Sequence, residues 1–291
     1  MTSLAFLGTP EVAVPPLLAL HHAGHDLRLV VSRADKRRGR GAELIPSPVK
    51  AAAVALGLPV TDRVDDVIGS GASLGVVVAF GRLIKPPVLA ALPMINLHFS
   101  LLPRWRGAAP VERAILAGDA VTGVCVMTLE EGLDTGPLHA CRSVDIGSDE
   151  TLEELRSRLV AIGTGLLVDQ LATGLTPPVP QRGEATYAAK LEPEELRLDW
   201  RQGAAQLHRV VRLGRAWTTF RGKRLRILRV RVIQPGGADP SLPPGRLDGL
   251  AVTTGNGTLE LVEVQPEGRQ AMAAARWRNG ARPVPGECLG P

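Results

Sequence analysis

Three side chains in the middle of the chain have the types and the spacing that acyl transfer to an amine requires. Asn96 and His98 are alternate residues of the apolar segment Met94–His98, so on a β-strand both side chains leave the same face. Asp134 lies in a loop with a glycine two residues to either side, which allows the backbone to bend sharply there. We therefore expect an amide, an imidazole and a carboxylate to share one pocket.

Such a set can stabilise the tetrahedral oxyanion that forms when a neutral amine attacks a formyl carbon. Asn96 and a protonated His98 can each donate a hydrogen bond to that oxygen. A carboxylate at Asp134 would stabilise the imidazolium and help to move a proton through water. No serine or cysteine nucleophile is needed if the amine attacks directly. Each residue alone has an ordinary structural interpretation, so the prediction depends on the combination.

The elements that must position these groups alternate between strand and helix up to about residue 175, which predicts a parallel α/β sheet. Ligands of such sheets bind at the carboxyl ends of the strands, where Asn96, His98 and the residues after Phe80 are expected. We expect Thr9 to cap the first helix, and Asp149 or Thr151 to lie near the cap of a later one. The expected strands are 4–7, 27–31, 75–80, 94–98 and 123–127, and the expected helices include 49–56, 110–117 and 151–171.

The composition changes after the Pro-rich stretch Thr173–Pro180. One helix over 204–213 is followed by expected strands at 225–232, 249–253 and 259–264, with Gly- and Pro-containing turns between them. This pattern predicts a second, smaller domain built as a β-barrel.

The spacing Asn96-Leu97-His98, then Ser100–Pro103 and Gly107, then Asp134-Thr135-Gly136 resembles the signature of the 10-formyltetrahydrofolate-dependent formyltransferase family. A wider set of motifs is similar to the methionyl-tRNA formyltransferases within it. These motifs are Gly39–Gly41, Pro46–Lys50, Ser100–Pro110, Gly118-Asp119, Gly132–Gly136, Thr186–Leu191, Asp199-Trp200 and Gln265–Met272.

The resemblance implies a Rossmann-like catalytic domain over 1–182, a linker over 183–203 and an OB-like tRNA-binding domain over 204–291. It places Asn96, His98 and Asp134 in catalysis. It implies that the formyl donor, 10-formyltetrahydrofolate, contacts two segments of the first domain. The residues concerned are Ser100, Leu101, Leu102 and Pro103, with Val78, Ala79, Phe80 and Gly81 beside the pterin.

Positive charge is concentrated in two places in a chain whose formal net charge is +5. The loop Lys36–Gly41 contains Arg37, Arg38 and Arg40, and the resemblance implies that it reaches the tRNA acceptor end. The segment 201–234 has many arginines and no acidic residue. We expect it to bind the phosphates of a folded RNA through Arg221, Lys223, Arg224 and Arg226.

These features predict formyl transfer to the α-amino group of initiator methionyl-tRNA. Two alternatives stay open: a formyltransferase for a small-molecule amine, and a non-catalytic RNA-binding protein with a degenerate transferase domain. We expect a cytoplasmic monomer with no membrane contact and no metal. The three cysteines are odd in number and widely spaced, so we expect neither a disulfide framework nor a zinc site, and Cys125 to be a small core residue.

Overall fold

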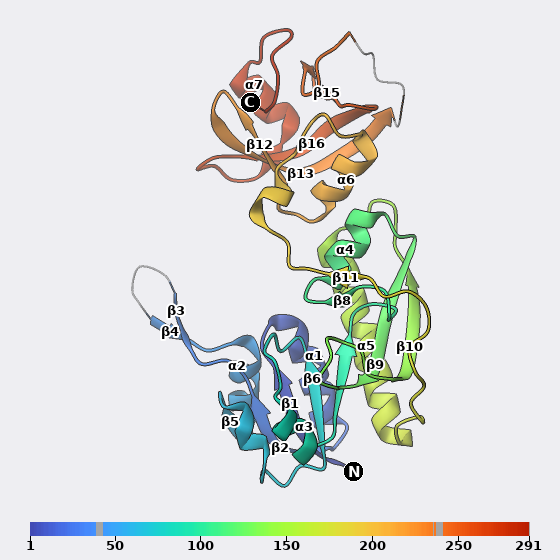
Figure 1. Ribbon diagram of the computed structural model, residues 1–291. Coiled ribbons are helices and arrows are strands. Elements are labelled where there is room, and N and C mark those ends of the chain that lie inside the picture. Colours follow the sequence, from blue (N-terminus) through green and yellow to red (C-terminus); the bar gives the residue numbers. More distant parts are fainter. Residues whose placement is uncertain (39–42, 235, 237–240, 291) are drawn as a thin grey trace. The chain divides into compact units, whose positions relative to one another are not determined.

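The computed structural model of the 291-residue chain describes residues 1–38, 43–234, 236 and 241–290. The chain folds into two compact units (Figure 1). The first contains residues 1–111, 120–145 and 155–189, and the second contains 112–119, 146–154 and 190–291. Of the residues expected to form a linker, 183–189 therefore lie in the first unit and 190–203 in the second.

The first unit is built on a seven-stranded sheet with the strand order β10-β9-β7-β6-β1-β2-β5. The pairs from β7 to β5 are parallel, whereas β9 pairs antiparallel with both β7 and β10. The predicted, mostly parallel α/β sheet is therefore confirmed. These strands are β1 (Ser3–Gly8), β2 (Asp26–Val31), β5 (Val60–Thr61), β6 (Leu74–Val78), β7 (Met94–His98), β9 (Val121–Thr128) and β10 (Leu138–Asp145).

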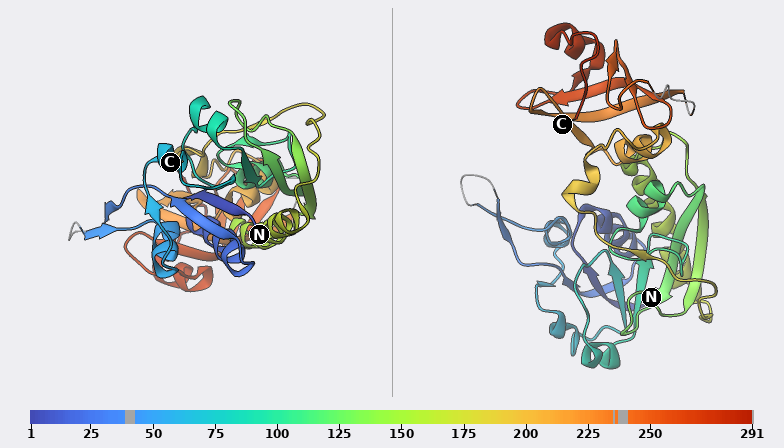
Figure 2. Two further views of the ribbon diagram at one scale, coloured as in Figure 1. Left: turned by 90° about the horizontal axis from the view of Figure 1, so that it is seen from below. Right: turned by 45° about the horizontal axis from the view of Figure 1, so that its top comes forward.

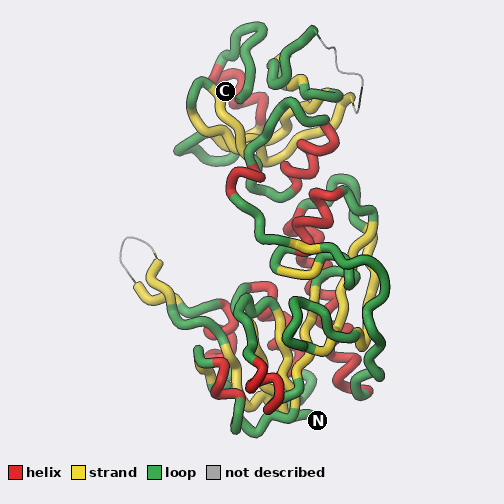
Figure 3. The backbone as a smooth tube through the Cα atoms, viewed as in Figure 1, coloured by secondary structure: helices red, strands yellow, loops and turns green. Residues whose placement is uncertain are grey.

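Helices lie between consecutive strands of this sheet except between β9 and β10, which a loop joins; Figure 3 shows the helices in red among the yellow strands. They are η1 (Glu11–Ala13), α1 (Val14–His22), α2 (Pro48–Ala55), η2 (Val64–Val67), α3 (Pro86–Ala91), α4 (Pro110–Ala117) and α5 (Leu152–Thr173). The last two helices continue across the boundary between the units. Thr151 begins α5 as predicted, because its hydroxyl accepts from Glu154 N at 3.3 Å and the Glu154 carboxylate accepts from Thr151 N at 2.9 Å.

The predicted cap at Thr9 is wrong. Pro10 is the residue before the 3₁₀ turn η1, which precedes α1 and has no side-chain cap. The Thr9 hydroxyl instead lies 3.5 Å from the carbonyl oxygen of Phe80, beyond the end of β6. Thr9 therefore connects two strand ends.

The expectation that the cysteines form no disulfide is also wrong. Cys125 is buried as predicted, but it is bonded to Cys141. Cys141 lies on β10, a strand that the sequence interpretation did not identify, and the antiparallel register of β9 and β10 places the two residues directly opposite each other. On its other side Cys125 pairs with His98 of β7. The disulfide therefore joins the two strands beyond the one that carries His98.

Two short pairs of strands complete the first unit. The hairpin of β3 (Lys36–Arg38) and β4 (Glu43–Ile45) projects from the rest of the unit in both views of Figure 2. The two-residue strands β8 (Arg106–Gly107) and β11 (Tyr187–Ala188) run parallel, although 80 positions separate them along the chain. Through this pair the end of the first unit returns to the segment that follows β7.

The second unit, for which the sequence predicts a small β-barrel, contains an antiparallel sheet with the strand order β12-β13-β16-β15-β14, and β17 also pairs with β16. Its core is mainly aliphatic, with Trp200, Phe220 and Trp277 as the aromatic members. The strands are β12 (Trp217–Phe220), β13 (Lys223–Gln234), β14 (Leu247–Asp248), β15 (Ala251–Thr253), β16 (Thr258–Pro266) and β17 (Met272–Ala273), and the helices are η3 (Pro193–Leu196), α6 (Ala204–Arg212) and α7 (Ala274–Ala281).

No helix among the described residues combines the length and the apolar character needed to cross a bilayer. In the same part of the chain, no group of three His, Cys, Asp or Glu side chains is arranged to hold a metal ion.

Candidate active site

His98 and Asp134 lie together at the end of β7, as the sequence predicts. His98 Nδ1 is 3.7 Å from Asp134 Oδ2, and the two side chains are only 6% and 12% exposed. At that separation the contact is electrostatic and is too long for a direct hydrogen bond. The structure thus brings together the imidazole and the carboxylate inside a mostly buried environment, where charge interactions are weakly screened.

The hydrogen bond of the other ring nitrogen fixes the tautomer of His98. His98 Nε2 lies 2.9 Å from the carbonyl oxygen of Trp105. A carbonyl only accepts, so Nε2 carries a hydrogen and donates it. Nδ1 is then the nitrogen that faces Asp134.

Asn96 lies two residues before His98 on the same strand, and its side chain is 9% exposed. Its backbone pairs with Val77 of β6 and Met127 of β9, so the sheet fixes the residue from both sides. Among the described residues its side-chain amide has no hydrogen-bond partner. Asn96 can therefore donate to a substrate oxygen, which makes the three groups suited to acyl transfer.

The carboxylate of Asp134 is held by the backbone. Its Oδ2 atom accepts a hydrogen bond of 2.8 Å from Gly107 N. The φ angle of Asp134 is +50°, in the left-handed region that aspartate tolerates better than most residues. Gly136 is required nearby, since a Cβ atom there would lie 1.9 Å from the carbonyl oxygen of Thr128. The Gly-containing loop thus delivers a carboxylate as predicted.

The segment Ser100–Pro103 has mainly packing contacts. Ser100 is fully buried, and its hydroxyl donates to the carbonyl oxygen of Arg104 at 2.6 Å. Leu102 is buried in a cluster with Cys125 and Met127, and Leu101 packs against this cluster. Pro103 follows a cis peptide bond and is half-buried. The segment therefore forms a mostly packed turn that follows His98.

The segment Val78–Gly81 continues from the carboxyl end of β6, the strand next to β7. Val78 and Phe80 are buried, and Ala79 and Gly81 have φ angles of +47° and +69°. The backbone therefore turns at two positions directly after the strand, at the same edge of the sheet as His98.

A polar side chain to which the sequence interpretation gave no role, Gln181, contacts the Asp134 loop, and a second one, Arg106, contacts Gln181. Gln181 donates to the carbonyl oxygens of Asp134 and Gly136, and Arg106 donates to Gln181. Arg106 belongs to a motif quoted for the resemblance, but Gln181 directly follows the Pro-rich stretch, where nothing in the sequence predicts a contact with a residue 47 positions away.

The first basic region lies on the β3–β4 hairpin. Lys36 and Arg37 of β3 are exposed, and their backbones pair with Ile45 and Leu44 of β4. Arg38 is the last residue of β3. Arg40 lies outside the described residues. The hairpin thus presents at least two cations on a projecting strand.

Three of the four cations predicted in the second basic region line a single hollow of about 590 Å³ in the second unit. Arg221, Lys223 and Arg224 are exposed, whereas Arg226 is half-buried. Arg269 and Arg276 also line the hollow and lie outside the segment that the sequence singled out, while Glu267 is its acidic member. We call this set of Arg221, Lys223, Arg224, Arg269 and Arg276 the basic hollow.

The four predicted cations differ in whether their charged groups already contact other residues of the protein. Arg221 forms two hydrogen bonds with the Glu287 carboxylate, of 2.6 and 2.8 Å, which raise the pKa of Arg221 and lower that of Glu287. Arg226 donates to Gln265 and to the carbonyl oxygen of Gly214. Arg224 stacks on the Trp217 ring at 4.3 Å. Lys223 has no ion-pair partner within the described ranges. Arg224 and Lys223 are therefore the most available of the predicted four.

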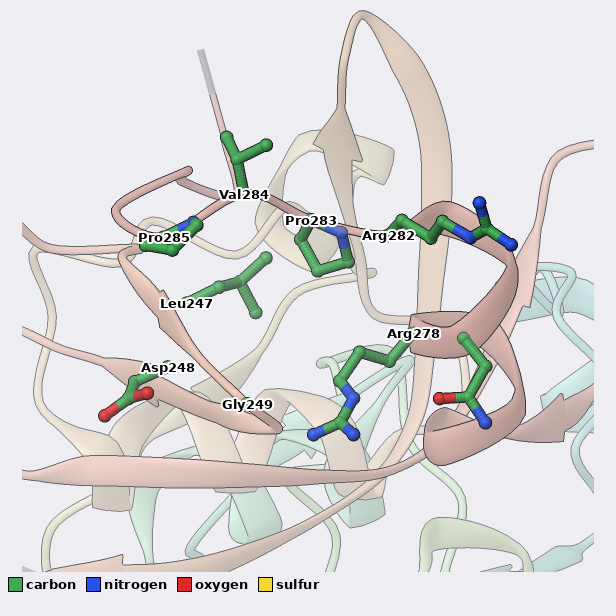
Figure 4. A pocket seen from close by; sticks show the side chains of 9 residues that line it. Leu247, Asp248, Gly249, Arg278, Arg282, Pro283, Val284 and Pro285 are labelled. Carbon is green, nitrogen blue, oxygen red and sulfur yellow. The ribbon is translucent and has the colours of Figure 1, made fainter.

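A second hollow of about 540 Å³ in this unit lies between β14 and the end of α7 (Figure 4). Arg278 points into it toward Gly249, while Arg282 points away from it (Figure 4). Asp248 and Pro283–Pro285 complete the rim. None of the residues predicted to bind tRNA lines this hollow.

Comparison with protein families agrees with this two-unit organisation. Residues 2–171 match the formyl transferase family, and residues 190–282 match the formyl transferase C-terminal domain. Proteins named methionyl-tRNA formyltransferase are similar over almost the whole chain. The one from Roseobacter denitrificans is 43% identical and covers 96% of this chain and 95% of its own, and the one from Methylococcus capsulatus is 41% identical and covers 99% of both.

Solved structures share the fold at low sequence identity. An N-formyltransferase from Helicobacter canadensis, in complex with folinic acid and dTDP-3-aminofucose, has a TM-score of 0.69 at 14% identity and covers 90% of this chain and 99% of its own. Methionyl-tRNA formyltransferase from Clostridium thermocellum has a TM-score of 0.58 at 16% identity and covers 79% of this chain and 93% of its own. Given the matches to both domains and the full-length relatives, this chain belongs to the methionyl-tRNA formyltransferase family.

Proposed function

We propose that this chain transfers the formyl group of 10-formyltetrahydrofolate to the α-amino group of methionine on initiator tRNA. The observation that carries this proposal is the 43% identity to a protein named methionyl-tRNA formyltransferase over 96% of the chain, because it includes both the catalytic and the C-terminal domain. The convergence of Asn96, His98 and Asp134 at the end of β7 supports the chemistry independently of that likeness.

In this proposal the neutral amine attacks the formyl carbon directly. The Asn96 amide donates a hydrogen bond to the developing oxyanion, and protonated His98 stabilises it through Nδ1. Asp134 stabilises the imidazolium. The bond between the formyl carbon and the folate nitrogen then breaks, the new amide remains on methionine, and the proton lost by the amine passes to the leaving nitrogen.

The formyl donor would lie against the strand-end segments Val78–Gly81 and Ser100–Pro103. Their backbones turn beside His98, and their side chains are mostly packed into the core. We propose that the pterin lies along these fixed turns, so that its binding needs little reorganisation. Leu101 and Pro103 are the half-buried residues of the second segment.

The tRNA would be bound through phosphates by the two basic regions. The basic hollow supplies Lys223 and Arg224, with a smaller contribution from Arg221, whose guanidinium group already has a partner. Arg226 lies outside the hollow and would contribute little, because its guanidinium group also has partners. Arg37, Arg38 and Arg40 would contact the acceptor end. We further propose that the chain acts as a monomer in the cytoplasm, where initiator tRNA is used, since one chain supplies all three catalytic groups.

The decisive experiment offers the purified chain 10-formyltetrahydrofolate with one acceptor at a time. The acceptors are methionyl-tRNA, free methionine, glycinamide ribonucleotide and a nucleotide-linked amino sugar. We expect formylation of methionyl-tRNA alone, detected as N-formylmethionine after mild hydrolysis of the ester. Formylation of a small amine and not of methionyl-tRNA would refute the proposed acceptor, and no formylation of any acceptor would favour an RNA-binding protein.

A further inference from the structure

The Asp134 loop has an unfavourable backbone that other residues must hold in place. The loop joins β9 to β10, and Asp134 itself is in the left-handed region with φ +50°. Its neighbour Leu133 is 59% exposed, so apolar burial contributes little to fixing it. A loop of this kind keeps one conformation only when hydrogen bonds from the surrounding structure select it.

Gln181 supplies hydrogen bonds that fix this loop. Its Nε2 atom donates to the carbonyl oxygens of Asp134 and Gly136, each at 2.8 Å. Its Oε1 atom accepts from Arg106 Nε at 3.1 Å and from Nη2 at 2.6 Å. Carbonyls only accept and a guanidinium only donates, so these partners allow one orientation of the amide. Both the donor and the acceptor end of the Gln181 amide therefore have hydrogen-bond partners.

These bonds close a ring around the catalytic carboxylate. Arg106 holds Gln181, Gln181 holds the main chain of Asp134, and Gly107 donates to the carboxylate of Asp134 at 2.8 Å. The residue before Arg106, Trp105, accepts the hydrogen bond of His98 Nε2. Residues 105–107 therefore contact both members of the His98–Asp134 pair.

The ring also depends on the end of the first unit. Gln181 comes from the segment that leads into β11, and β11 pairs with β8, the strand formed by Arg106 and Gly107 (Figure 1). Trp105 N donates to the Thr186 hydroxyl at 2.9 Å. Residues 181–188 thus hold the segment after β7 in place.

We propose that Gln181, together with Arg106, is a positioning residue of the reaction: it sets the distance between Asp134 and His98 and does not touch the substrates. This inference rests on the proposed function, since it assigns a role within the same site. Glutamine is required because the position must donate at one end and accept at the other. Glutamate can accept from Arg106 but cannot donate to the two carbonyls, and its charge would repel them.

The test compares Gln181→Glu with Gln170→Glu in the full-length chain. Gln170 lies in the same unit and only accepts, from Thr176 N at 3.0 Å, so glutamate preserves its contact. We expect Gln181→Glu to lower kcat about 10- to 10²-fold, with an unchanged KM for methionyl-tRNA. Gln170→Glu should keep wild-type kcat. Arg106→Ala combined with Gln181→Ala should cost much less than the product of the two single effects.

A second measurement does not depend on catalysis. The ¹³Cε1–¹H NMR signal of His98, assigned by its loss in His98→Ala, should move in Gln181→Glu and stay in place in Gln170→Glu. If Gln181→Glu is too unstable to purify, Gln181→Met removes the same hydrogen bonds without adding charge. A wild-type kcat and an unmoved His98 signal would overturn the proposal. Failure of the wild-type chain to formylate methionyl-tRNA would refute the proposed function and leave the NMR test valid.

Discussion

The described residues include two histidine–aspartate pairs, one in each unit, and they differ in how their members are held. His98 Nδ1 is 3.7 Å from Asp134, whereas His208 Nε2 is only 3.2 Å from Asp149. The Asp134 side chain is 12% exposed and the Asp149 side chain is 83% exposed. The shorter contact therefore belongs to the aspartate that water screens.

The two pairs also differ in the groups that surround them. Asp134 accepts from Gly107 N, and His98 donates to the carbonyl of Trp105, so the backbone fixes both groups. Burial lowers the pKa of His208, with smaller contributions from Arg212 and Arg209, against the opposing effect of Asp149. The two pairs thus differ in how firmly the backbone fixes them more than in their separation, and this difference is the reason we propose His98–Asp134 as the functional pair.

The largest effect that separates the two pairs should be on turnover. We expect Asn96→Ala, His98→Ala or Asp134→Ala each to lower kcat about 10²-fold or more, the scale of losing an oxyanion donor or an acid–base group. His208→Ala and Asp149→Ala should retain turnover close to that of the wild type. Single-turnover formylation of methionyl-tRNA measures this directly.

Folding must be checked beside these rates. The three active-site variants should keep the wild-type circular dichroism spectrum, because the side chains lie at strand ends and in a loop. Near-normal turnover in all three would refute the assignment of the site. An equal loss of turnover in His208→Ala and His98→Ala would show that the His208–Asp149 pair matters as much for turnover as the His98–Asp134 pair.

Removing charge without removing the side chain gives a smaller effect and a sharper comparison. Asp134→Asn keeps an oxygen that can accept from Gly107 N, so the loop should hold its conformation while the negative charge is lost. We expect kcat to fall about tenfold or more, because the imidazolium loses its stabilising charge. Asp149→Asn should leave kcat unchanged. A wild-type kcat in Asp134→Asn would mean that the carboxylate acts only as a hydrogen-bond acceptor.

The placement of Asn96 and His98 could be predicted from the sequence, because alternate residues of a strand lie on the same face. Met94–His98 is a strand with the predicted bounds, and the edge at which its side chains emerge follows from parallel topology. What could not be predicted depends on long-range contacts. The strand containing Cys141 and the side chain of Gln181 reach the site through pairings that no local pattern encodes.

For the basic segment 201–234, in contrast, the sequence did not predict which side chains are available to a ligand. Its composition does not show which arginines are exposed. Arg212 is buried and donates to the carbonyl oxygens of Glu150 and Gly147. Arg221 pairs with Glu287 and Arg231 with Glu260, so the neutralising acids come from outside the segment. Apolar and basic residues do not alternate strictly along β13, because the register of β13 with β16 shifts on both sides of Arg229. Leu225, Ile227 and Val230 are buried as a result.

This difference among the arginines predicts unequal effects on tRNA binding. Replacing Lys223 and Arg224 by glutamine should raise the KM for methionyl-tRNA and flatten its dependence on salt. The log–log slope should fall by roughly 0.7–0.9 for each phosphate contact removed. Arg221→Gln should change the slope less and should lower thermal stability more, because it breaks the pair with Glu287. Equal salt slopes in all variants would contradict a role for the basic hollow, while KM for the folate should stay constant throughout.

The smallest effect concerns the second pair, and it is a pH dependence of stability. Burial is the largest cause that lowers the pKa of His208 in the folded chain, followed among the lowering effects by Arg212 and Arg209, while Asp149 raises it. The exposed Asp149 carboxylate is screened by water, so we expect burial to prevail over the 3.2 Å contact. In the unfolded chain the imidazole has its ordinary pKa of about 6.5. Below that pH the unfolded state binds the proton more readily, so the contribution of His208 to stability is complete above about pH 6.5 and falls as the pH drops below it.

Urea unfolding between pH 7.5 and 5 should therefore show a smaller loss of stability in His208→Gln than in the wild type, and a larger loss in Asp149→Asn. The contribution of His25, whose pKa burial also lowers, is common to all three proteins and cancels in the comparison. If the wild type instead gains stability over His208→Gln on acidification, the ion pair with Asp149 prevails, and the two pairs are more alike than their burial suggests.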